Sequence, residues 1–217
     1  MPIVKFVYLD AEAKGEVARL LFAAGNIDYA DFRISFADWP KHKANTPFGQ
    51  MPVLHWDGEE LAQSWAINKF IARKVGWAGK TDLEFAQADM VACHTEDLWT
   101  KWPKLRFEKV QADRETGANE LLKEFFPKVL GPLETMLKKR GGEWYAGSGA
   151  TFADLAVMVH LDFLHAPEEL AFKDMNNVAE RRKVLDAFPL VKANYQRTCA
   201  LPAVAEWKKK RPAFTGF

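Results

Sequence analysis

Cysteine is scarce in this chain, and its placement excludes several kinds of site. The 217 residues contain only Cys93 and Cys199, which lie far apart. They form neither a CxxC pair nor a Cys/His metal-binding spacing. No apolar segment follows Met1, because the chain passes directly into a strand-like pattern. We therefore expect a protein of the reducing cytoplasm that carries no secretory signal.

Net charge and long apolar runs are also lacking. Lys and Arg number 30 and Asp and Glu 29, which leaves a formal charge of +1 at pH 7. This balance gives no reason to expect nucleic acid or an acidic membrane surface as a partner. The basic run at residues 208–211 lies near the end of a predicted helix and is typical of a solvated helix C-terminus. No stretch approaches the roughly 20 apolar residues that a membrane span needs.

The composition that remains is ordinary for a globular protein, with 48% hydrophobic and 27% charged residues. The chain is long enough for one full domain or two modest ones. In the first part, strand and helix signals alternate. Strands are predicted at 3–8, 27–34, 52–56 and 59–62, and helices at 14–24 and 64–75, with a short helical segment between 35 and 47. This order, βαβ followed by ββα, predicts a small α/β domain resembling thioredoxin.

Helical periodicity dominates the second part of the chain. Helices are predicted near 83–110, 118–139, 152–165, 177–187, 189–198 and 202–211. Pro103 is expected to bend or break the first of them. The change in composition at residues 77–82 indicates a linker. We therefore predict an α/β domain at 1–76 and an all-α domain at 83–217.

One turn, residues 48–54 (FGQMPVL), is the most informative short segment. Proline cannot donate to a strand ladder, so Pro52 belongs at the first residue of a strand or on an edge strand. In this setting we expect the Met51–Pro52 bond to be cis, with the backbone of Met51 turned toward a ligand. The pair Gln63-Ser64 follows at a predicted helix start, where free N–H groups and the positive dipole end favour a carboxylate.

With a tyrosine at the end of the first strand, these features resemble the cytosolic glutathione transferases, most closely the sigma class. The resemblance spans essentially the whole chain and is carried by Tyr8, Trp39, Lys43, Gln50, Gln63 and Ser64. It implies a homodimeric enzyme that conjugates the thiolate of reduced glutathione to electrophilic, mostly hydrophobic compounds. Peroxidase and prostaglandin isomerase reactions are neighbouring activities of the family. Glutathione would be a cosubstrate, and no covalently bound cofactor is implied.

The resemblance also assigns the catalytic role. Tyr8 would donate its O–H to the glutathione sulfur, which lowers the pKa of the thiol and yields the nucleophilic thiolate. No cysteine occurs before residue 93, which disfavours a cysteine-dependent oxidoreductase. Lys14 stands where the family usually has arginine. Lysine keeps the charge but loses the planar fork, so a general electrostatic role is expected.

The rest of the implied glutathione site follows from the same resemblance. Its residues are Tyr8, Lys14, Trp39, Lys43, Gln50, Met51, Pro52, Gln63, Ser64 and Asp97 of the partner subunit. Gln63 and Ser64 would bind the γ-glutamyl group, and Met51 would pair its backbone with the cysteinyl part. Lys43 would supply the counter-charge to the glycine carboxylate.

Simpler interpretations stand beside these assignments. Tyr8 alone is an ordinary strand-end residue, and Gln63-Ser64 alone is a helix cap. Trp39 and Lys43 can equally be a surface aromatic and a solvated charge. For the whole chain, the alternative is a non-catalytic member of the fold, crystallin-like or an interaction module. Such members tend to lose the polar residues or to insert segments in the helical domain, and neither occurs here.

The helical domain is less informative. Trp99, Trp102 and Phe217 are candidates for a hydrophobic cosubstrate site, with core packing or simple surface docking as the alternatives. Asp97 adjoins Glu96, and either side chain can simply be exposed. The resemblance implies that family members can bind a divalent metal near acidic residues on this helix, but Cys93 replaces one of the carboxylates, so no metal is predicted. Two further expectations are structural: His160 and His165 belong to packing or surface, and Thr151-Phe-Ala-Asp154 forms a capping box.

Overall fold

The computed structural model describes residues 3–165 and 178–212, except for the side chains of residues 100, 102–107 and 178–180. These residues form two compact units. The first comprises the described residues up to Ala78 together with those from Leu201 onward, and the second runs from Gly79 to Ala200.

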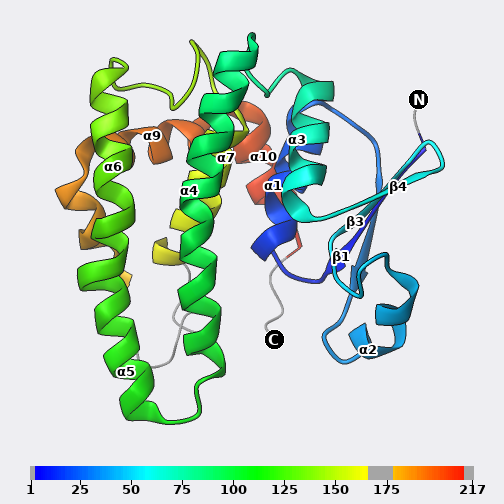
Figure 1. Ribbon diagram of the computed structural model, residues 1–217, viewed down its shortest axis with the longest axis horizontal. Helices are drawn as coiled ribbons and strands as arrows, with labels where there is room; N and C mark the ends of the chain where they lie inside the picture. Colours follow the sequence, from blue (N-terminus) through cyan, green and yellow to red (C-terminus); the bar gives the residue numbers. More distant parts are fainter. Residues whose placement is uncertain (1–2, 166–177, 213–217) are drawn as a thin grey trace. The chain divides into compact units, whose positions relative to one another are not determined.

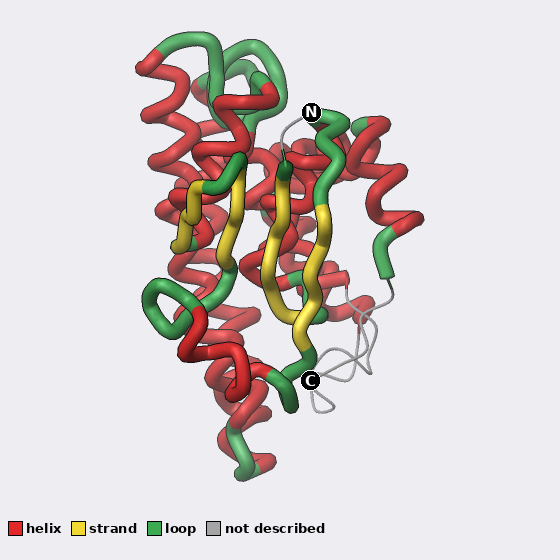
Figure 2. Tube along the Cα trace, turned by 90° about the vertical axis from the view of Figure 1, so that its right-hand side faces the viewer, coloured by secondary structure: helices red, strands yellow, loops and turns green. Residues whose placement is uncertain are grey.

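The first unit is built on a four-stranded sheet in the order β2-β1-β3-β4 (Figure 2). The strands are β1 (Val4–Leu9), β2 (Ala30–Ile34), β3 (Val53–Trp56) and β4 (Glu59–Ala62). β1 runs parallel to β2 and antiparallel to β3, and β3 pairs antiparallel with β4. The predicted βαβ-ββα order is therefore confirmed.

The second strand begins later than predicted, at Ala30 rather than residue 27. The reason lies at the end of the preceding helix. There the N–H of Ile27 donates to the carbonyl of Phe22 at 2.9 Å, so Ile27 closes the helix instead of joining the sheet.

Helices complete the first unit. The 3₁₀ turn η1 (Ala13–Gly15) leads into α1 (Glu16–Ala24), α2 (Trp39–His42) continues into η2 (Lys43–Asn45), and α3 is Ser64–Val75. α1 and α3 pack together beside the sheet (Figure 1). The last helix, α10 (Pro202–Lys210), packs against α1. We expected this segment within the helical domain at 83–217, whereas its contacts place it with the first unit.

In the described residues of the second unit, the regular structure is helical. Its elements are α4 (Asp82–Phe107), α5 (Gln111–Glu120), the π-helical turn η3 (Leu121–Phe125), α6 (Phe126–Lys139), α7 (Phe152–Asp162), η4 (Phe163–His165), α8 (Val178–Lys183), η5 (Val184–Ala187) and α9 (Pro189–Ala200). α4 packs on α6 and α7, and α9 packs on the same two helices (Figure 1).

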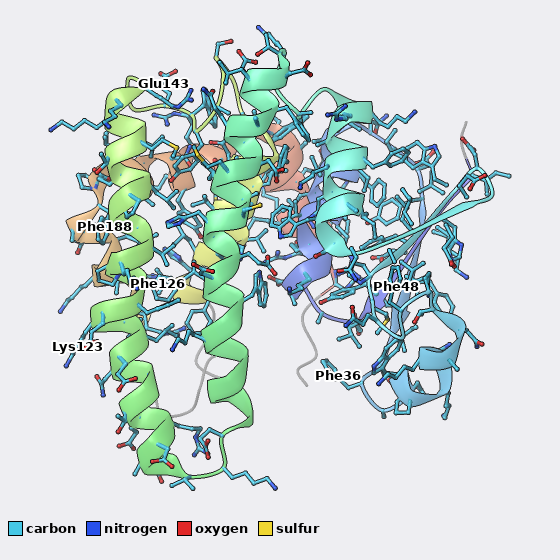
Figure 3. All side chains as sticks on the ribbon, in the orientation of Figure 1. Phe36, Phe48, Lys123, Phe126, Glu143 and Phe188 are labelled. Carbon is cyan, nitrogen blue, oxygen red and sulfur yellow. The ribbon has the colours of Figure 1, made fainter. Side chains whose placement is uncertain are left out.

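Two boundaries in this unit differ from the prediction. Of the bend or break expected at Pro103, the break does not occur, because α4 continues to Phe107. A proline removes one helical hydrogen bond at a cost of about 3 kcal/mol, which the packing of α4 on two other helices offsets. The helix predicted to start at 118 starts at Gln111 and passes through the π-turn into α6. Figure 3 marks the first residue of α6, Phe126, whose side chain is buried.

The centre of the second unit is α7, whose residues from Phe152 to Leu161 are all buried. The predicted capping box is confirmed at its start. The Thr151 hydroxyl accepts a bond from the backbone of Ala153, while Asp154 Oδ2 accepts the N–H of Thr151 at 2.8 Å. Asp154 Oδ1 also accepts bonds from the amide side chain of Asn194 and the backbone N–H of Tyr145. This carboxylate therefore joins three segments of the unit.

Two histidines of this unit, His160 and His165, pack against aromatic rings. His160 lies with its ring 5.4 Å from Trp99, and His165 stacks on Tyr195 at 4.7 Å, both measured between ring centroids. Within residues 3–165 and 178–212, no cluster of three His, Cys, Asp or Glu side chains is arranged to hold a metal ion. No helix there combines the length and the apolar character needed to cross a membrane.

Candidate functional site

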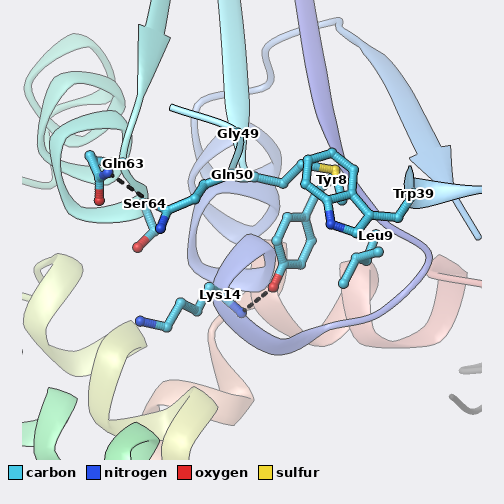
Figure 4. A pocket seen from close by; sticks show the side chains of 9 residues that line it. Tyr8, Leu9, Lys14, Trp39, Gly49, Gln50, Gln63 and Ser64 are labelled. Atoms are coloured by element: carbon cyan, nitrogen blue, oxygen red, sulfur yellow. Dashed lines mark hydrogen bonds between the residues drawn. The ribbon is translucent and has the colours of Figure 1, made fainter. Parts of the chain in front are cut away.

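A cavity of about 380 Å³ opens in the first unit, at the carboxyl end of β1 (Figure 4). This size is within the range of small-molecule sites. Four segments line it: the end of β1 with η1, the start of α2, the turn before β3, and the start of α3. The lining residues are Tyr8, Leu9, Lys14, Trp39, Gly49, Gln50, Met51, Gln63 and Ser64.

Most of the residues predicted from the sequence for a ligand site come together here. Leu9 and Gly49 were not predicted, although each adjoins a predicted residue and Gly49 has a positive φ of 60°. Pro52 does not line the cavity but is buried at the start of β3. Lys43 is exposed and lies next to the cavity. A methyl group built on Gly49, which lines the cavity, would be 3.5 Å from Lys43 Cε.

The remaining candidates lie in the second unit or outside the described residues. Asp97 is an exposed residue of α4. Trp99, on the same helix, contacts the ring of buried His160, which agrees with the packing interpretation. The side chain of Trp102 and the whole of Phe217 lie outside what the structure describes.

Tyr8 occupies the middle of the site, between Trp39 on one side and Gln50, Gln63 and Ser64 on the other in Figure 4. Its side chain is 5% exposed. The hydroxyl oxygen accepts a hydrogen bond from the backbone N–H of Lys14 at 3.1 Å. Gly15 touches the same ring, because a Cβ at this position would lie 2.3 Å from Tyr8 Cδ1. The η1 turn therefore holds the tyrosine closely, and only glycine permits the contact.

Gln63 forms the opposite wall with an unusual backbone. Its φ of 72° and ψ of 117° are rare for a residue other than glycine. Such conformations cost about 1–3 kcal/mol and occur preferentially at functional sites. The Gln63 side-chain amide donates to Gln50 Oε1 at 3.2 Å, which links the α3 start to the turn before β3. Ser64 follows as the first residue of α3, where backbone N–H groups and the positive dipole end favour an anion.

The turn before β3 packs against buried apolar residues of the sheet. The Met51–Pro52 bond is cis, as expected. Met51 and Trp39 are partly buried, and both pack against a small apolar cluster formed by Val7, Ile34 and Val53. The segments that carry the polar groups of the cavity are therefore held by apolar packing, which restricts the movement of these groups.

Similarity to known proteins covers nearly the entire chain. Residues 5–73 match the model of the glutathione S-transferase N-terminal domain, and residues 96–211 match that of the C-terminal domain. The chain is 35% identical to hematopoietic prostaglandin D synthase of Gallus gallus over 212 residues, covering 98% of each chain. It is 34% identical to glutathione S-transferase 1 of Ascaris suum, again covering 98% of each. Among solved structures, monomeric Na-GST-3, a glutathione S-transferase of the hookworm Necator americanus, matches with a TM-score of 0.84 and 31% identity, covering 98% of this chain and 99% of that one.

Proposed function

This chain belongs to the glutathione S-transferase family, and we propose that it is an enzyme that transfers the thiolate of reduced glutathione to electrophilic, mostly hydrophobic compounds. The observation that carries the proposal is the cavity itself. It brings a buried tyrosine, a helix N-terminus and the turn that contains Gln50 and Met51 to one place. Glutathione has a thiol, two carboxylates and a peptide backbone, of which the tyrosine would bind the thiol, the helix N-terminus one carboxylate and the turn the backbone.

Tyr8 is the proposed catalytic residue. Its oxygen accepts the N–H of Lys14, and the hydroxyl would donate its proton to the glutathione sulfur in the cavity. A donor that binds the charged form of the thiol lowers its pKa and raises the fraction of nucleophilic thiolate. The bond from the Lys14 amide polarises the hydroxyl and makes it a better donor.

The other groups would hold the tripeptide. The α3 start, with Gln63 and Ser64, suits the γ-glutamyl carboxylate. The backbone of Met51, presented beside Pro52, would pair with the cysteinyl part in the manner of an added strand. The exposed ammonium group of Lys43 would approach the glycine carboxylate across Gly49, with Trp39 and Gln50 beside it. Lys14 adds positive charge near the thiolate.

Assembly and compartment are further parts of the proposal. We expect a homodimer in which Asp97 of the partner subunit reaches the γ-glutamyl amine, and a cytoplasmic location. Because the hookworm structure is described as monomeric, sedimentation of the purified protein is the direct measurement. A dimer whose glutathione affinity falls in Asp97→Asn would support this assembly. A monomer with full affinity would contradict it.

A second reaction, isomerisation of prostaglandin H2, is favoured by one observation, the 35% identity to the chicken prostaglandin D synthase. Product analysis with prostaglandin H2, a lipid hydroperoxide and an aryl halide, at equal enzyme concentration, ranks the three reactions. Formation of prostaglandin D2 no faster than without enzyme would remove the isomerase from consideration.

The test of the main proposal combines glutathione binding by calorimetry with conjugation to an aryl halide. We expect wild type to bind glutathione and turn over, and Tyr8→Phe to bind it while kcat/KM falls by about a hundredfold or more, the usual effect of losing a group that controls a proton in catalysis. Tyr29→Phe is the matched control. Tyr29 lies in the same unit, and its buried hydroxyl finds no hydrogen-bond partner among the described residues.

Each result has a distinct meaning. Absence of glutathione binding in wild type would contradict the proposal and favour the non-catalytic alternative. Binding with full turnover in Tyr8→Phe would contradict only the role of Tyr8.

A further inference from the structure

A buried carboxylate near the proposed catalytic tyrosine has partners far away in the sequence. Glu16, the first residue of α1, is only 1% exposed. Its Oε1 accepts hydrogen bonds from Trp207 Nε1 at 2.8 Å and from Arg211 Nη1 at 2.7 Å. Trp207 lies on α10, and Arg211 directly follows that helix. All three residues belong to the first unit.

Arg211 also reaches the other side of the η1 turn. Its Nη2 lies 3.0 Å from Oε1 of Glu12, the residue immediately before η1. One guanidinium therefore binds the carboxylates that precede and follow the turn. A planar group with several fixed donors suits such bridging, whereas a lysine ammonium lacks this geometry.

The turn between these two carboxylates is the segment that controls Tyr8. Lys14 donates its backbone N–H to the Tyr8 hydroxyl, and Gly15 lies against the Tyr8 ring. Ala13 has a φ of 35°, a left-handed conformation that is unfavourable for alanine. A residue persists in such a conformation only when surrounding contacts hold it there. The contacts made by Glu12 and Glu16 are in the right place to do so.

We propose that Arg211 and Trp207 are positioning residues that clamp the η1 turn through Glu12 and Glu16 and thereby set the orientation of the Tyr8 hydroxyl. The inference rests on the proposed function, in which that hydroxyl stabilises the glutathione thiolate. The end of α10 thus contributes to catalysis without touching the substrate. Removing a partner leaves Glu16 buried with its charge less compensated, so the carboxylate and the turn attached to it must shift.

The informative variant is Trp207→Phe, which keeps an aromatic ring on α10 and removes one hydrogen-bond donor. Arg211→Lys is the second variant, because it keeps the charge but cannot bridge two carboxylates in the same way. The matched control is Lys210→Met on the same helix, since Lys210 pairs with Glu206 and both side chains are exposed. The glutathione site itself is left intact in all three.

Three measurements test the clamp. The first is the pH titration of the thiolate absorbance of bound glutathione, the second is kcat and KM for conjugation, and the third is amide hydrogen exchange of the segment 12–16 without ligand. In Trp207→Phe and Arg211→Lys we expect the titration to move to higher pH, kcat to fall about tenfold, and the glutathione dissociation constant to stay unchanged. A displacement of about 1 Å at a reacting group can cost up to about a hundredfold in rate. Exchange of the segment should accelerate, and Lys210→Met should match wild type throughout.

The same substitutions in a Tyr8→Phe background separate positioning from a general effect on folding. If the clamp acts through the hydroxyl, Trp207→Phe causes no further loss of kcat there. An equal tenfold loss with and without the hydroxyl would overturn the inference, and so would unchanged exchange of segment 12–16. Failure of the proposed function has a different signature, because wild type would then bind no glutathione while the exchange result still reports on the clamp.

Discussion

Asp154 in the second unit and Tyr8 in the first are both buried, but their polar groups have different uses. In the second unit, Asp154 bonds to Thr151, Tyr145 and Asn194, so its polar contacts are consumed in holding three segments together. In the first unit, a buried hydroxyl and a helix start face a cavity instead. One arrangement completes a fold, while the other leaves donors directed toward a ligand.

The two units also differ in how many of their described residues have an unfavourable backbone conformation. Among the described residues other than glycine, those with positive φ are Ala13, Asn26, Asp57 and Gln63, and all of them lie in the first unit. Gln63 lines the cavity, and Ala13 adjoins Lys14, which also lines it. Positive φ is unfavourable for alanine and glutamine and persists only where surrounding contacts hold it, so backbone strain is present where the site is built. The predictions below test this division, in order of decreasing effect.

The largest expected effect is on the folding of the second unit. Asp154→Ala leaves buried donors of Thr151, Tyr145 and Asn194 without their acceptor, so we expect a loss of about 3 kcal/mol or more in the free energy of unfolding. Urea denaturation measures it, with Asp113→Ala as control, because Asp113 is exposed in the first turn of α5. The folded fraction should still bind glutathione. An Asp154→Ala variant that keeps its stability but no longer binds glutathione would contradict the assignment of Asp154 to folding.

Gly15→Ala, in the first unit, should slow the chemical step. The added methyl group would lie 2.3 Å from the Tyr8 ring, so either the ring or the turn must move. We expect kcat to fall on the order of a hundredfold, as for a displacement of about 1 Å at a reacting group. Steady-state kinetics measures this effect. Gly149→Ala is the control, since its methyl group would meet nothing within 4 Å. Equal kinetics for the two variants would show that the Gly15 contact is not needed.

Ser64→Ala should weaken binding rather than turnover. A hydrogen bond to a charged group contributes about 1.5–3 kcal/mol, so we expect the glutathione dissociation constant to rise about tenfold or more with kcat nearly unchanged. Calorimetry and kinetics separate the two effects. Ser148→Ala, an exposed serine of the second unit that accepts a bond from Lys80, serves as control. A fall in kcat alone would assign Ser64 to the chemical step.

The smallest effect, on the free energy of unfolding, is expected for a substitution inside α6. A methyl group on Gly131 meets no side chain beyond its chain neighbours closer than Phe188 Cε1 at 4.0 Å, but Pro132 follows and disfavours the helical conformation of a preceding residue that carries a Cβ. Gly131→Ala should change the free energy of unfolding by no more than about 0.5 kcal/mol, because the gain in helix propensity is offset by crowding against Pro132. Gly142→Ala should destabilise instead, since Gly142 has a φ of 88°. Chemical denaturation compares the two, and a destabilisation of Gly131→Ala as large as that of Gly142→Ala would contradict the prediction.

Much of the first unit was accessible from the sequence because its signals are local. Alternating apolar residues, a proline before a strand and a glycine after a helix each depend on a few neighbouring residues. Tyr8, Gln63 and Ser64 could be placed at the end or the start of a predicted element for the same reason, whereas their grouping into one site was implied by the family resemblance. Leu9 and Gly49 were missed because lining a cavity depends on three-dimensional proximity and leaves no periodic pattern.

The interpretation of the second unit was less complete. Continuation of α4 through Pro103 contradicts the local rule for proline, because tertiary packing outweighs one lost hydrogen bond. The π-turn between α5 and α6 also has no distinct sequence signal. For Trp99, sequence alone left packing and substrate contact open, and its neighbour His160 became known only from the fold.

The sequence by itself determined the family, the order of the elements and the residue types available for a thiolate site, because these depend on local pattern and identity. Only the tertiary structure decided which of those residues share a cavity, and that the Lys14 amide rather than its ammonium group contacts Tyr8. It also brought Arg211 to Glu16, across 195 residues of chain. Such contacts arise from the packing of distant segments, which no short sequence pattern records.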